Sequence, residues 1–115
     1  MLTRKNDVSL KRLKGKKRIE LLFRKGWRLH SAHLILHYLP LEQEAVFHLG
    51  VSVAKQRFKG AVDRNRIKRQ LRVAIESNKE LLSLSGFGML IFKGREKIET
   101  NTLVLECETL LNQLK

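Results

Sequence analysis

The chain has 115 residues, of which 43% are hydrophobic, and this combination fits one globular domain rather than two domains or a disordered chain. The 24 Lys and Arg residues against 11 Asp and Glu residues give a formal net charge of +13, which indicates a polyanionic partner, most often a nucleic acid. The single cysteine, Cys107, excludes an intramolecular disulfide and a thiolate zinc cluster. No signal peptide and no apolar run of membrane-spanning length is recognisable, so we expect a cytoplasmic protein without a membrane partner.

The excess positive charge lies in two blocks of the sequence. Residues 1–28 carry a net charge of +9 and residues 55–75 carry +7, whereas the rest of the chain is slightly acidic. A solvated protein surface usually mixes both signs of charge. The two blocks therefore predict two stretches of a polyanion-binding surface.

The first basic block contains a predicted arm and a predicted helix. Residues 1–12 are expected to form a flexible basic arm. Apolar residues with helical spacing predict a short helix over residues 17–25, and Gly26 is a plausible end for it.

Two strands are predicted next. Residues 33–39 form an apolar run that ends at Pro40, which is typical of a strand end. Residues 46–54 alternate between large apolar side chains and small or polar ones, which predicts a strand with one apolar face. We expect the two strands to pair as an antiparallel hairpin.

The second half of the chain predicts two helices and one strand. Residues 62–76 have helical periodicity, and Asn78 either ends this helix or belongs to a second short helix. Residues 88–93 predict a buried strand, and residues 100–114 predict an amphipathic helix. The resulting order, α-β-β-α-β-α, predicts an α+β fold: a single-domain, two-layer α-β sandwich with one mixed sheet.

The basic stretch KGAVDRNRIKRQLR, residues 59–72, carries the strongest functional signal. One side of this predicted helix is apolar, and the other presents guanidinium, ammonium and amide groups that suit phosphate and ribose contacts. The alternative is a solvated basic face, but Asp63 is the only acidic residue in the stretch. The candidate RNA-binding residues of this helix and the loop before it are Lys55, Lys59, Arg64, Asn65, Arg66, Lys68, Arg69 and Arg72.

This stretch resembles the RNR signature of the bacterial ribonuclease P protein family. The likeness extends over most of the chain and includes LKGKKRIELLFRKG at residues 13–26, LGVSVAKQ at residues 49–56 and GMLIFK at residues 88–93. The sequence departs from the family pattern at Ile19 and His37, where family members often have aromatic residues.

The resemblance implies a left-handed crossover around the basic helix, against the usual right-handed rule. It also implies a cleft between the first helix and the sheet that holds the single-stranded 5′ leader of precursor tRNA. The partner would be a catalytic RNA that itself holds most of the Mg²⁺ and performs the cleavage, with no obligate protein partner and no catalytic residue in the protein. The candidate cleft residues are Ile19, Phe23, His37, His48, Ser52 and Lys93.

Several alternatives remain open in the sequence. No catalytic set is recognisable, and His33 and His37 share a strand face without a nearby carboxylate or thiol, which favours RNA contact over metal binding. Phe23 either stacks on RNA bases or packs the first helix onto the core, and Trp27 and Phe58 each present the same choice. A non-enzymatic ribosomal or RNA-chaperone-type protein is the main alternative function, ahead of a DNA-binding protein and a stand-alone nuclease.

Overall fold

One strand, β5 (Gly86–Phe92), lies at the centre of the fold, and its GFGMLIF sequence is apolar on both faces. The computed structural model describes residues 9–41, 46–54, 58, 60–82 and 85–114, and within these residues five strands form one sheet in the order β1-β4-β5-β3-β2. The other strands are β1 (Ser9–Lys11), β2 (Trp27–His30), β3 (Leu34–Pro40) and β4 (Val46–Val53).

The expected antiparallel hairpin between β3 and β4 is wrong, because β5 lies between these two strands. β5 runs antiparallel to β3, with Leu90 opposite Leu36, and parallel to β4, with Leu90 opposite Val51. A strand that is apolar on both faces gains most from the central position, whereas β3 and β4 each carry a histidine on one face.

The predicted helices are confirmed with small shifts at their ends. The helical elements are α1 (Lys16–Lys25), α2 (Ala61–Ser77), the short 3₁₀ helix η2 (Lys79–Leu81) and α3 (Thr100–Asn112). Asn78 ends α2, and its buried side-chain amide donates hydrogen bonds to the carbonyl oxygens of Ala74 at 2.8 Å and Val104 at 3.0 Å. This amide joins the end of α2 to α3. None of the described helices combines the length and the apolar character needed to cross a bilayer.

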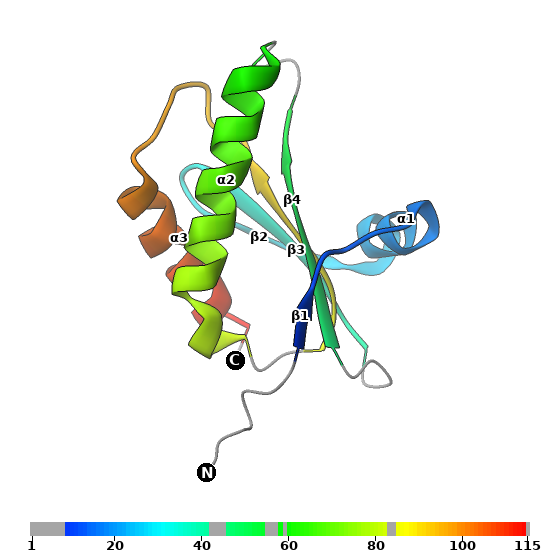
Figure 1. Cartoon of the computed structure of the whole chain (residues 1–115). Helices are drawn as coiled ribbons and strands as arrows, with labels where there is room; N and C mark the ends of the chain where they lie inside the picture. Colours follow the sequence, from blue (N-terminus) through cyan, green and yellow to red (C-terminus); the bar gives the residue numbers. More distant parts are fainter. Residues whose placement is uncertain (1–8, 42–45, 55–57, 59, 83–84, 115) are drawn as a thin grey trace.

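The helices cover opposite faces of the sheet (Figure 1). α2 and α3 pack on one face over the larger apolar core, in which Phe47, Leu71 and Leu110 are fully buried. α1 lies on the other face, which we call the α1 face, over a small cluster formed by Leu13, Leu22, Phe87 and Met89. The α+β class with a mixed sheet is confirmed, and α2 is the crossover between the parallel strands β4 and β5.

Cys107 lies inside the larger core. Burial raises the pKa of its thiol to about 12, and a hydrogen bond with Asn78 opposes this rise only in part. The expectation that this thiol packs in the core is confirmed.

Two strands were missed by the sequence patterns. β1 pairs in parallel with β4, so the expected flexible arm is wrong for residues 9–11, while residues 1–8 lie outside the described residues. β2 follows α1 directly at Gly26, where an added Cβ would lie 2.5 Å from the carbonyl oxygen of Leu22 and 3.0 Å from that of Tyr38. Only glycine fits this close junction between helix and sheet, and the strand after it is too short to show an alternating pattern.

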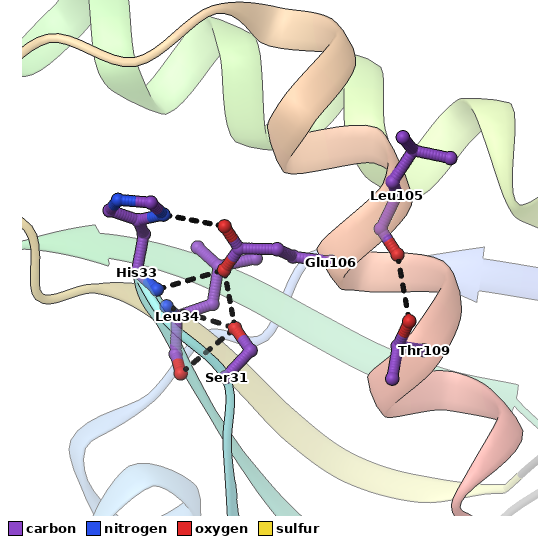
Figure 2. Close-up of polar contacts among 6 residues, drawn as sticks. All are labelled: Ser31, His33, Leu34, Leu105, Glu106 and Thr109. Carbon is purple, nitrogen blue, oxygen red and sulfur yellow. Dashed lines mark hydrogen bonds and ion pairs between the residues drawn. The ribbon is translucent and has the colours of Figure 1, made fainter.

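A partly buried carboxylate, that of Glu106 on α3, fastens the turn between β2 and β3 to α3, as Figure 2 shows. One oxygen of Glu106 accepts hydrogen bonds from the Ser31 hydroxyl at 2.5 Å and from the backbone amide of His33 at 2.8 Å. The other oxygen lies 2.5 Å from the His33 Nδ1 atom. The Ser31 hydroxyl also accepts a hydrogen bond from the Leu34 amide at 3.2 Å, so one carboxylate fixes the whole turn.

These contacts determine the pKa of Glu106. Burial alone would raise the pKa, but the hydrogen bonds from the His33 side chain, the Ser31 hydroxyl and the His33 amide outweigh burial and hold the pKa of Glu106 below its ordinary value of 4.5. A lowered pKa in the folded state means that the ionised carboxylate stabilises the fold. This stabilisation is complete above the ordinary pKa and is lost as the pH falls through the lowered one.

We expect Glu106→Gln to lower the free energy of unfolding at pH 7 by about 1–3 kcal/mol, because hydrogen bonds to a charged acceptor are lost. Glu108→Gln, an exposed position on the same helix, is the matched control and should change stability little. Urea unfolding at several pH values measures both variants. The difference between wild type and Glu106→Gln should shrink below pH 4, and a difference independent of pH would contradict the assignment.

Candidate nucleic-acid interface

The basic residues of α2 lie on the side of the helix that faces away from the sheet. Ile67 and Leu71 are buried against the sheet and α3. The Lys68 side chain is half-buried. The exposed polar and basic residues on this side are Asn65, Arg66, Arg69 and Arg72.

Arg64 differs from the other basic residues of α2, because it also contributes to the fold. One of its guanidinium nitrogens donates a hydrogen bond to the carbonyl oxygen of Phe58 at 2.8 Å. Phe58 is buried, and its ring lies 5.8 Å from that of Phe92, so it covers the core and does not offer a stacking surface. The predicted residues Lys55 and Lys59 lie outside the described residues.

Arg12 connects the two basic blocks in space. It lines a cavity of about 240 Å³ together with Arg72 of α2, and it lines a second cavity with Lys14, Arg18 and His48 on the other side of β1. In Figure 1, β1 runs along the edge of the sheet between α2 and α1. Arg12 therefore lies between Arg72 on one side and Lys14 and Arg18 on the other, although Glu76 also lines the first cavity. We call Arg12, Lys14, Arg18 and Arg72 the basic band.

The most exposed aromatic side chain of the α1 face belongs to Phe23. Its neighbour Leu22 is fully buried and fixes α1 to the sheet, whereas Phe23 is 47% exposed. The Phe23 ring meets the His37 ring edge-on, with the ring centroids 4.5 Å apart. Leu22 is therefore the residue that packs this part of α1 onto the core. Trp27 is 61% exposed, but it lies opposite Tyr38 and so belongs to the other face of the sheet.

His37 is a buried neutral group beneath Phe23. It is 8% exposed, and its Nδ1 atom has no hydrogen-bond partner among the described residues. Burial lowers the pKa of His37 below 6.5, and the nearby charges of Arg28 and His30 lower it further. An uncharged ring supports the edge contact with Phe23 at neutral pH.

The other four candidate cleft residues also lie on the α1 face, but they are not gathered at one point. Ile19 packs against the small cluster, and Ser52 and Lys93 are half-buried. His48 is buried beside Phe87, with ring centroids 5.5 Å apart, and lines the cavity of the basic band. The face thus has a basic part near the start of α1 and an aromatic part near its end.

The sequence interpretation missed several cations of this interface. Arg12, Lys14 and Arg18 lie within the first basic block, whose charge was the available signal. Arg28 and His30 lie on the unpredicted strand β2, where the register places them beside His37 and Ile35 of β3. No group of three or more His, Cys, Asp or Glu side chains suited to one metal ion occurs within the part of the chain that the structure describes.

Basic residues on both faces of a mixed sheet are typical of a nucleic-acid-binding protein, here of the α+β class. The model of the family described as Ribonuclease P matches residues 9–115. The ribonuclease P protein component of Streptococcus agalactiae is 33% identical over 92 residues, which cover 80% of this chain and 83% of that protein. That of Rickettsia felis is 34% identical over 110 residues, covering 88% and 92% of the two chains.

Solved structures share the fold. The RNase P protein from Thermotoga maritima has a TM-score of 0.79 at 20% identity, covering 91% of this chain and 98% of that one. The RNase P protein of Staphylococcus aureus gives 0.76 at 24% identity, covering 90% and 94%.

The chain belongs to the ribonuclease P family. It is the protein subunit of a ribonucleoprotein endonuclease that processes the 5′ end of tRNA, and it associates with the RNase P RNA. The alternative of a ribosomal or RNA-chaperone-type protein is not favoured.

We expect Arg66→Ala and Arg69→Ala each to weaken binding to the RNase P RNA and to reduce its salt dependence by about one unit or less, because each removes one cation available for a phosphate contact. Thermal stability should stay close to that of wild type. Lys79→Ala, an exposed cation on η2, is the control. Titrations at several salt concentrations measure the slope, and wild-type binding by an Arg66→Ala/Arg69→Ala double variant would contradict the prediction.

Arg64→Ala should behave differently, because its guanidinium holds the Phe58 carbonyl. We expect a loss of stability of about 1 kcal/mol from this hydrogen bond, in addition to weaker RNA binding. A melting curve recorded without RNA separates the two effects, and an unchanged melting temperature would refute the structural role.

Proposed function

We propose that this subunit binds two RNAs on opposite faces of its sheet. The exposed side of α2, with Arg64, Asn65, Arg66, Lys68, Arg69 and Arg72, and the preceding loop with Lys55 and Lys59, contact the catalytic RNA. The α1 face binds the 5′ leader of precursor tRNA. The protein acts in the cytoplasm, without a membrane partner or an obligate protein partner.

The observation that carries the leader site is the exposure of Phe23. An apolar ring at a helical position next to the core is usually buried, yet this ring is half-exposed beside a partly exposed sheet face. Aromatic rings that stack on bases bind single strands without reading sequence, which suits a leader of variable sequence. His37, beneath Phe23, orients the ring rather than stacking on a base itself.

The remaining candidate residues contribute to the same face. Ser52 offers a hydroxyl and Lys93 an ammonium group at the ends of β4 and β5, while Ile19 supports α1 from below. His48 sits beneath the basic band and belongs with its cations rather than with Phe23.

Mg²⁺ is assigned to the partner RNA. The described residues contain no group of three or more His, Cys, Asp or Glu side chains that could hold a metal ion, and Glu106 is already bonded to Ser31 and His33. When bound to the RNA, Mg²⁺ supplies the activated water and the charge stabilisation of phosphodiester cleavage. The protein binds, orients and neutralises the RNA strands with its cations.

We expect Phe23→Ala to weaken binding of precursor tRNA to the holoenzyme by about 1–3 kcal/mol, the contribution of one stacked base. Affinities for mature tRNA and for the catalytic RNA should stay near wild type. Trp27→Ala, which removes an exposed aromatic ring from the opposite face, is the matched control. His37→Ala should cause a smaller loss, because it only frees the Phe23 ring.

Fluorescence titrations with tRNA carrying or lacking a short leader measure these affinities. Equal losses for both tRNAs, or a larger effect of Trp27→Ala than of Phe23→Ala, would overturn the leader site.

A further inference from the structure

Three nitrogen-bearing side chains line the outer edge of the α1 face. Arg28 and His30 point to this face, because Arg28 lies opposite His37 and His30 lies opposite Ile35 in the antiparallel register. Lys93 follows the end of β5, and its Nζ atom lies 3.3 Å from the His30 Nδ1 atom. We call Arg28, His30 and Lys93 the β2 rim.

The β2 rim has no acidic partner within the described residues. Neither Arg28 nor Lys93 forms an ion pair there, and the α3 carboxylate nearest the adjacent turn, that of Glu106, is bonded to Ser31 and His33. Arg28 and His30 are exposed. Cations gathered without a counter-charge repel one another, and a bound anion relieves this repulsion.

The contact between Lys93 and His30 fixes which hydrogen-bonding groups the rim presents. An ammonium group can only donate, so in this contact the Nδ1 atom of His30 accepts and its Nε2 atom is left to face outward as the N–H donor. The rim therefore offers an imidazole N–H, an ammonium group and a guanidinium fork. All three are donors for phosphate oxygens.

The spacing of the rim suits an extended strand. Arg28 and His30 are alternate residues of one β-strand, about 6.6 Å apart, which is close to the separation of successive phosphates in an extended nucleotide chain. β2 is an edge strand of the sheet that the described residues form, so none of those strands lies beyond it. Arg28 also lies beside His37, which contacts Phe23. A strand with one base on Phe23 can thus lay its backbone along β2.

We propose that the β2 rim is a phosphate-binding site that holds the backbone of the tRNA 5′ leader while Phe23 stacks on one of its bases. This assignment rests on the proposed leader site and adds residues to it. The turn held by Glu106 keeps His30 in register with Lys93, because the amide of Lys93 donates to the carbonyl of His33 at 2.9 Å. The rim binds any sequence, since it recognises phosphate and not bases.

The test uses the holoenzyme reconstituted with the catalytic RNA and two ligands, precursor tRNA with a short leader and mature tRNA. Arg28→Ala and a His30→Ala/Lys93→Ala double variant should each raise the Kd for precursor tRNA about three- to tenfold, with a smaller salt slope. The Kd for mature tRNA and that of the free protein for the catalytic RNA should stay unchanged. Arg28→Lys should recover part of the loss, because it keeps the charge without the fork.

Arg95→Ala is the control for a general loss of charge, since Arg95 is exposed and lies two residues after Lys93. A leader with one neutral methylphosphonate, moved along the strand, then tests the phosphate directly. At one position, the neutral linkage should weaken binding of the precursor tRNA by the wild-type holoenzyme, but it should not further weaken binding by the Arg28→Ala variant.

Other outcomes would overturn the proposal in distinguishable ways. If the rim variants weaken binding to the catalytic RNA alone, the phosphates come from that RNA and not from the leader. If Arg95→Ala raises the Kd for precursor tRNA as much as the rim variants do, the loss of affinity comes from the general reduction in positive charge and not from a site. If Phe23→Ala loses leader affinity while the rim variants do not, the rim site fails and the leader site stands, whereas normal binding by all these variants refutes both.

Discussion

A central strand that is apolar on both faces governs the arrangement of this protein. β5 must be covered on each side, so α2 and α3 lie on one face and α1 lies on the other. Among the described residues, the cations of α2 and those at the start of α1 thereby lie on opposite faces, and Arg12 lines a cavity with each group. One small sheet can thus contact two RNA strands at the same time.

The two faces of the sheet contribute unequally to stability. The large apolar core beneath α2 and α3 contains most of the fully buried side chains, whereas α1 rests on a small cluster around Leu22. Burial of apolar area is the main source of folding free energy, so the α2–α3 side holds the fold. The α1 side leaves Phe23 and the β2 rim open for a ligand, and the Glu106 contacts fasten its edge to α3.

The sequence patterns predicted the long elements well, because each is long enough to show its period. β1 and β2 are too short for this, and the pairing of β3 with β5 is a long-range property that no local pattern encodes. The same division holds for the interface. The RNR residues are recognisable along one helix, whereas the position of Arg28 and His30 on the α1 face follows only from the register of β2 against β3.

The single thiol of the chain provides a way to distinguish a loss of stability from a loss of RNA binding. Cys107 lies in the core beneath α3, and with a pKa of about 12 almost none of it is the reactive thiolate at neutral pH. Alkylating reagents therefore modify the protein only when the core opens, and the modification rate follows the free energy of that opening. The alkylation rate of Cys107 in the native chain therefore reports on unfolding of the core. It distinguishes a variant with a damaged core from one that has lost only an RNA contact.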